Sequence, residues 1–91
     1  MAFSFNQYNL NKLEAFLKEL GWQVRYEKGN FQSGSCIVRD KQMVVINKFV
    51  PLEQKVVALV GIILSLEIKI EDLSPQSLSL LNELKKIKLA S

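Results

Sequence analysis

The sequence of 91 residues contains no histidine, a single cysteine and only two prolines. Without histidine, the chain cannot build a Ser-His-Asp or Cys-His catalytic site, a histidine-ligated zinc site or a histidine pH switch. A single cysteine cannot form a disulfide within the chain, so the cysteine content gives no sign of an oxidising compartment. We therefore expect a protein without enzymatic activity that holds no metal and no cofactor.

Long apolar runs and a strong charge of one sign are also missing. The longest apolar run, residues 56–66, has eleven residues, whereas a membrane-spanning helix needs about 20. The first residues lack the basic and apolar regions of a signal peptide. Lysine and arginine number 12 against 9 acidic residues, and only Lys85, Lys86 and Lys88 form a local basic group. We predict a cytoplasmic protein that does not bind membranes.

The apolar content is sufficient for a folded domain. Hydrophobic residues make up 48% of the chain and charged residues 23%. A chain of this size buries roughly 60–65% of its unfolded surface, which is enough for one core without disulfides or metals. Neither a linker nor an internal repeat divides the sequence, so we expect a single domain over residues 1–91.

Two periodic patterns open the chain. Leucine and phenylalanine recur every three or four residues from Leu10 to Leu20, which predicts a helix that begins between residues 5 and 10. Gly21 should end this helix, because glycine adopts the left-handed conformation without a steric penalty. Strict alternation over residues 22–27 then predicts a strand with Trp22 and Tyr26 on its buried face.

Residues 35–39 and 42–47 read as two further strands joined by a tight turn at Asp40-Lys41. This turn would create four facing pairs: Val38 with Met43, Cys36 with Val45, Ile37 with Val44, and Ser35 with Ile46. Both faces of the hairpin are then apolar, so we expect both to be covered and Cys36 to be buried. Phe31, in the loop before the hairpin, is a candidate for contact with a partner.

Residues 52–66 predict a long central helix that begins after Pro51. Its large apolar residues should pack on the sheet, while its opposite side carries small residues that let another backbone approach closely. That side is covered either by another helix of the chain or by a second protein. The candidate interaction residues are Ala58, Gly61, Ile62, Ser65 and, from the loop, Phe31.

Residues 67–71 alternate and suggest a short extended segment, and Ser74-Pro75 is a helix start signal. The last helix should run to about Lys88. The whole pattern predicts an α+β fold: a helix, a three-stranded, mostly antiparallel meander, a long central helix and a C-terminal helix.

This order of elements resembles the ImmA/IrrE-type metallopeptidase module over residues 10–66. The similar features are a helix ending in Leu20-Gly21, a strand reading Val-Val-Ile-Asn at residues 44–47, and Pro-Leu-Glu-Gln-Lys-Val at residues 51–56 before a long helix. In that family the long helix carries a His-Glu-x-x-His zinc motif. Here Gly61 and Ser65 stand at the two histidine positions, and Ile62 stands at the glutamate position.

None of these three residues supplies a zinc ligand or a general base. The resemblance therefore implies a member without catalytic activity. The chain also resembles small uncharacterised bacterial proteins of this length, which implies no activity.

The remaining candidate residues favour a binding role. The acidic residues show no metal-binding spacing, and the aromatic residues of the first strand do not share a face with Arg25, as a base-stacking surface would require. A domain of this size has few layers with which to cover its apolar hairpin and central helix. We therefore expect a protein–protein interaction or scaffold module that acts as a homodimer. The alternative is a nucleic-acid-associated protein that uses scattered basic residues.

Overall fold

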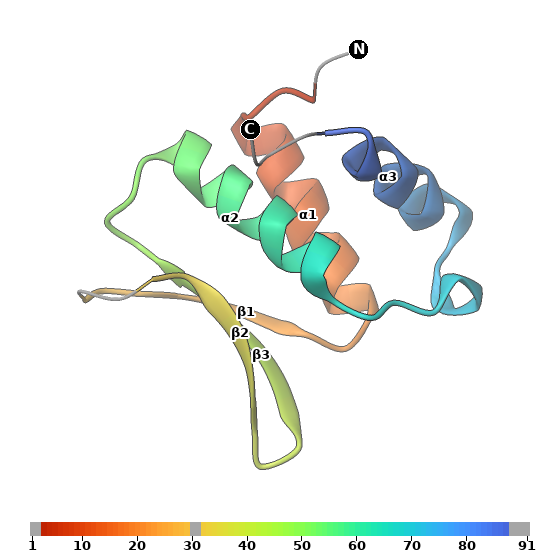
Figure 1. Cartoon of the computed structure of the whole chain (residues 1–91). Coiled ribbons are helices and arrows are strands. Elements are labelled where there is room, and N and C mark those ends of the chain that lie inside the picture. Colours follow the sequence, from red (N-terminus) through yellow and green to blue (C-terminus); the bar gives the residue numbers. More distant parts are fainter. Residues whose placement is uncertain (1–2, 30–31, 88–91) are drawn as a thin grey trace.

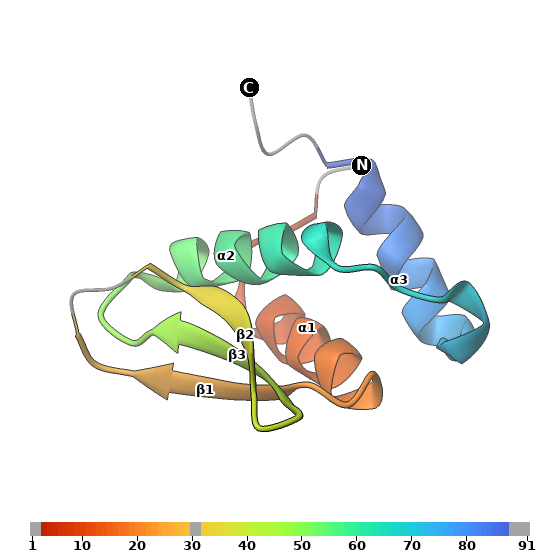
Figure 2. The same cartoon turned by 60° about the horizontal axis from the view of Figure 1, so that its bottom comes forward.

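The computed structural model describes residues 3–29 and 32–87, so Phe31 and Lys88 lie outside the described residues. The elements in chain order are α1 (Gln7–Glu19), β1 (Gln23–Glu27), β2 (Gly34–Val38), β3 (Lys41–Asn47), α2 (Leu52–Ser65), the short 3-10 helix η1 (Ile70–Asp72) and α3 (Pro75–Lys85). Helices α1 and α2 lie side by side on one face of the sheet, and α3 packs beside them (Figures 1 and 2). The predicted α+β fold is confirmed.

Helix α1 begins and ends as the sequence predicts. The side chain of Asn6 accepts a hydrogen bond from the N–H of Asn9 at 2.9 Å, which satisfies a free donor of the first turn. Leu13 and Leu17 are completely buried on its apolar face. Gly21 follows the helix with φ +87°, the left-handed conformation for which glycine was expected.

Helix α3 is fixed to α1 at its N-cap residue, Ser74. The side chain of Ser74 caps α3 by accepting a hydrogen bond from the N–H of Ser77, and Pro75 is the first helical residue, as predicted. The Ser74 hydroxyl and main-chain N–H also donate to the two carboxylate oxygens of Glu19, at 3.0 and 3.1 Å. These hydrogen bonds, the main-chain one first, lower the pKa of Glu19.

The sheet has three strands in the order β1-β3-β2, with β1 parallel and β2 antiparallel to β3. The sequence predicts three strands, but a meander would have placed β2 in the middle. Strand β3 takes that position because it is the longest strand and contributes Val44 and Ile46, both completely buried. Asn47, at its end, donates from its side chain to the Gly29 carbonyl and from its main chain to Ser33 Oγ, which holds the β1–β2 connection across the end of β3.

The hairpin turn consists of Arg39 and Asp40, with φ 50° and 67°, and not of Asp40 and Lys41. Positive φ at both residues is what a two-residue turn requires when it matches the twist of its strands. The predicted facing pairs are therefore wrong by two residues. The observed pairs are Val38 with Lys41, Ile37 with Gln42, Cys36 with Met43, Ser35 with Val44, and Gly34 with Val45. Because a shift of two residues keeps every side chain on its face, Val44 and Ile46 still point to the core.

Only one face of the sheet is covered within the described residues (Figure 2). Met43 and Val45 of β3 point to the other face, where Arg25 of β1 and Cys36 of β2 flank them in the register. The expectation of cover on both faces is wrong, because α1 and α2 pack together on the same side. Cys36 is exposed rather than buried, since it lies on an edge strand and points to the uncovered face.

The position of the turn can be tested by placing Asn-Gly, the residue pair that suits this turn best, at each of the two possible positions. Asn-Gly is the preferred sequence for this turn type, so Arg39→Asn with Asp40→Gly should raise the free energy of unfolding by about 0.5–1 kcal/mol. Asp40→Asn with Lys41→Gly should lower it, since Lys41 is an extended strand residue. Urea unfolding followed by circular dichroism measures both, and the opposite ranking would support the Asp40-Lys41 turn.

Candidate functional site

The predicted interaction residues of α2 do not form one open surface. Ile62 is 8% exposed and belongs to the core, and Ala58 packs partly buried against it. Gly61 is half-buried, and Ser65 is exposed with its hydroxyl donating to the Ile62 carbonyl at 2.7 Å. Helix α2 contacts α1, α3 and β3. Most of this small-residue side is therefore covered by the chain's own elements.

Two of the exposed apolar side chains lie instead on the β2 edge of the sheet. Ile37 is 65% exposed and Val38 49%, and they point to opposite faces of the sheet. Val57 and Leu64 of α2, each 37% exposed, lie about half a turn around the helix from Lys55. Lys55 reaches over the Tyr26 ring on β1, so Val57 and Leu64 face the β2 side of the sheet. We call Ile37, Val38, Val57 and Leu64 the β2 surface.

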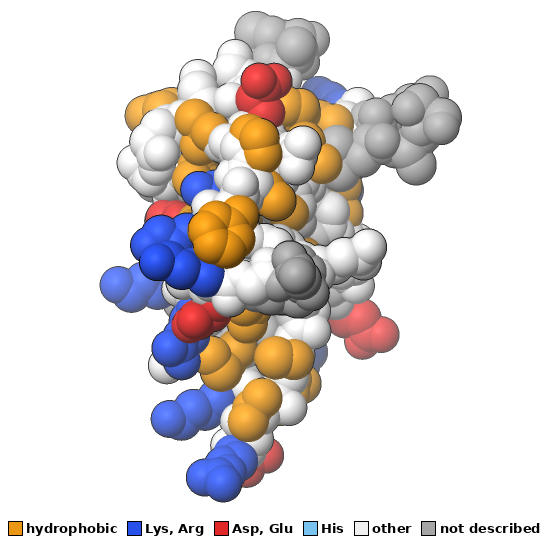
Figure 3. Space-filling model, turned by 90° about the vertical axis from the view of Figure 1, so that its left-hand side faces the viewer, with side chains coloured by type: hydrophobic (Ala, Val, Ile, Leu, Met, Phe, Trp, Pro, Cys, Tyr) orange, Lys and Arg blue, Asp and Glu red, His pale blue; other side chains and the backbone are white. Residues whose placement is uncertain are grey.

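A space-filling view shows this end of the molecule (Figure 3). Hydrophobic side chains run down the part formed by the hairpin, and lysine and arginine side chains gather along one margin. The strand Gly34–Val38 itself contains no charged residue and no proline. Natural edge strands usually carry such residues, because these prevent pairing with another strand. Strand β2 is therefore an unprotected edge.

The pairing of β2 with β3 determines which main-chain N–H and C=O groups of β2 point away from the sheet. Val38 and Lys41 flank the two-residue turn and form a hydrogen-bonded pair, and such pairs alternate with pairs that share no hydrogen bond. The N–H of Lys48 donates to the Glu27 carbonyl, so the even-numbered residues of β3 point toward β1, which agrees with this alternation. The N–H and C=O groups of Ser35 and Ile37 therefore point away from β3.

The sequence could have indicated this surface only in part. Apolar residues on both faces of the hairpin were visible, and Val57 and Leu64 lie at the margins of the apolar side of α2. Their exposure depends on β2 being an edge strand, which local sequence does not determine.

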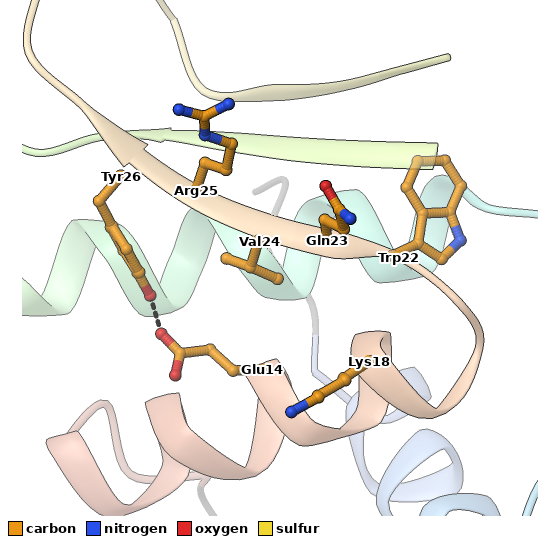
Figure 4. Close-up of a pocket in the computed structure, with 7 residues that line it drawn as sticks. All are labelled: Glu14, Lys18, Trp22, Gln23, Val24, Arg25 and Tyr26. Atoms are coloured by element: carbon orange, nitrogen blue, oxygen red, sulfur yellow. Dashed lines mark hydrogen bonds between the residues drawn. The ribbon is translucent and has the colours of Figure 1, made fainter. Parts of the chain in front are cut away.

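A groove between α1 and β1 is the second candidate site (Figure 4). It has a volume of about 470 Å³ and is lined by Glu14, Lys18, Trp22, Gln23, Val24, Arg25 and Tyr26. Val24 and Tyr26 point from the strand toward α1, while Arg25 points to the other face. The Tyr26 hydroxyl donates a hydrogen bond to the Glu14 carboxylate.

Burial, together with the Glu14 hydrogen bond and charge, raises the pKa of Tyr26 above its ordinary value. The phenol therefore stays protonated at neutral pH and acts as a structural donor rather than as a general base. Lys55 lies 5.8 Å from the centre of the Tyr26 ring, a cation–π contact. Trp22 and Tyr26, interpreted as core residues, are half-buried and pack against the edge of the buried cluster.

The positions of the zinc motif lie on α2, where the resemblance places them, with Ile62 turned into the core. In the described part of the chain, no three cysteine or acidic side chains come close enough to hold a metal ion. In residues 3–29 and 32–87, no helix is long and apolar enough to cross a membrane.

Comparison of the chain with protein-family models, with curated proteins and with solved structures found no significant match. The ImmA/IrrE-type resemblance stays a prediction.

The Tyr26–Glu14 hydrogen bond predicts a pH-dependent contribution to stability. Tyr26→Phe should lower the free energy of unfolding by about 1 kcal/mol at pH 7. Because the folded-state pKa of Tyr26 is raised, this contribution is complete below the pKa of an unfolded tyrosine, about 10, and is lost as the pH rises above it. Urea unfolding of both proteins between pH 7 and 11 measures the difference.

Tyr8→Phe is the matched control, because Tyr8 is 71% exposed. It should change stability little at any pH. A Tyr26→Phe protein as stable as wild type at pH 7 would contradict the assigned hydrogen bond.

Proposed function

We propose that the chain is a non-enzymatic protein-interaction module that acts as a homodimer through the β2 surface. The observation that carries the proposal is the exposure of Ile37 and Val38 on both faces of an unprotected edge strand. Exposed apolar side chains beside an uncharged free strand edge are typical of a surface that contacts another protein. Val57 and Leu64 add two exposed apolar side chains on the β2 side of α2.

The non-enzymatic part of the proposal rests on residue types. The chain has no histidine, and the polar pair in the α1–β1 groove is used within the fold, since Tyr26 donates to Glu14. A cytoplasmic location is part of the same proposal, because a reducing compartment suits the exposed, free thiol of Cys36.

Binding of nucleic acid has less support. A base-stacking sheet needs aromatic and basic side chains on one exposed face, whereas Tyr26 points toward α1 and Trp22 packs partly buried against the core. Arg25, on the uncovered face, forms an ion pair with Glu27 at 3.0 Å. Lys85 and Lys86 are exposed at the end of α3, away from the sheet. Nucleic-acid binding at low salt that weakens steeply with salt would favour this alternative.

Light scattering coupled to size exclusion tests the homodimer. We expect wild-type protein to show the mass of a dimer at micromolar concentration and to dissociate on dilution. Ile37→Lys should weaken association at least about tenfold, which corresponds to 1.4 kcal/mol, because it places a charge in the apolar contact. Circular dichroism shows whether the variant remains folded.

Tyr8→Lys serves as the control. It replaces a similarly exposed apolar residue that lies beside α3 rather than β2. It should dimerise like wild type. Wild-type protein that stays monomeric over the whole concentration range would overturn the proposal.

A further inference from the structure

We infer that β2 pairs antiparallel with β2 of a second copy around a two-fold axis at Cys36. The two three-stranded sheets would then form one continuous sheet of six strands. This inference rests on the proposed homodimer and adds its geometry: which edge is used, in which direction, and in which register. A homodimer with two-fold symmetry uses the same patch of both copies, so the strand must be complementary to itself.

The hydrogen-bonding groups of β2 meet this requirement. Ser35 and Ile37 turn their main-chain N–H and C=O groups outward, whereas Cys36 turns its own toward β3. Antiparallel pairing centred on Cys36 places Ser35 of one copy opposite Ile37 of the other. Opposed residues that both point their groups into the shared edge exchange both main-chain hydrogen bonds. Cys36 then faces its equivalent at a position that shares no hydrogen bond.

The register follows from what lies at each end of the strand. Centring on Cys36 pairs the whole of Gly34–Val38 with itself. Centring on Val38 would require Arg39 and Asp40 to pair as strand residues, but their positive φ values turn the chain away. Centring on Gly34 would draw Ser33 into the new ladder, although its hydroxyl already holds the end of β3 through Asn47.

Apolar side chains would lie close to the axis on both faces of the extended sheet. On the helix side, Ile37 of each copy lies opposite Ser35 of the other. On the other side, Cys36 meets its counterpart next to Met43, and Val38 lies opposite Gly34 of the other copy. No like charges are brought together, because β2 is uncharged.

The β1 edge fits a second copy less well. It carries the charged residues Arg25 and Glu27, and the α1 side chains Glu14 and Lys18 line the groove beside it. Strand β2 contains no charged residue, so an identical strand can pair with it without opposing a charge. A second copy of this chain is therefore the occupant that the β2 edge fits.

Cys36 reports directly on this geometry, because it is the only cysteine of the chain. Opposed residues without a shared hydrogen bond have Cα atoms about 4.5 Å apart, within the range of about 4.4–6.8 Å that a disulfide allows. Treatment of the wild-type dimer with diamide, which accepts the two thiol hydrogens, should give a covalent dimer on a non-reducing gel within minutes. Cys36→Ser should stay a dimer by light scattering but give no covalent product.

The matched control moves the thiol along the same face. In Cys36→Ser with Val38→Cys, the two cysteines would lie about 13 Å apart, so diamide should give at least tenfold less covalent dimer. Covalent dimer from position 38 but not from position 36 would overturn the register. A dimer by light scattering that cross-links from neither position would overturn the β2 pairing and leave the proposed function standing. A wild-type protein that is monomeric by light scattering would overturn the proposed function itself.

Discussion

The burial of Val44 and Ile46 beneath α1 and α2 is the contact on which the rest of the structure depends. Both side chains are completely buried, so β3 must lie under the two helices. With β3 in the centre, β1 and β2 become the edges of the sheet. Strand β1 is flanked by α1, whereas β2 keeps an uncharged and exposed edge. The proposed dimer contact is thus a consequence of which strand the helices cover.

Much of this fold could be predicted from local sequence, because the signals are local. The cap at Ser74 and the glycine after α1 depend on a few neighbouring residues. The face of each strand depends only on alternation, so Val44 and Ile46 point inward even though the predicted register was wrong by two residues. The turn was misplaced because Asp40 belongs to both possible turns, and its tolerance of positive φ does not distinguish them.

The order of the strands and the exposure of individual side chains could not be predicted from local sequence. With β3 in the middle, the connection between β1 and β2 must cross the end of β3. The hydrogen bonds that hold this connection join Asn47 to Gly29 and Ser33, which are 18 and 14 residues away in the sequence. The exposure of Cys36 and the burial of Ile62 follow from that arrangement and from the position of α3. The sequence therefore indicated an excess of apolar surface on the hairpin and the central helix, but the interaction residues chosen from it lay on α2 and at Phe31 rather than at the β2 edge.

The most direct measurement is hydrogen exchange of the β2 amides at two protein concentrations, followed by NMR. If a second copy completes the sheet, the N–H groups of Ser35 and Ile37 exchange slowly at high concentration and become fast on dilution. The N–H of Cys36, which bonds within the hairpin, stays protected at both concentrations and serves as the internal reference. Equally fast exchange of Ser35 and Ile37 at both concentrations would contradict the pairing of β2 with a second copy.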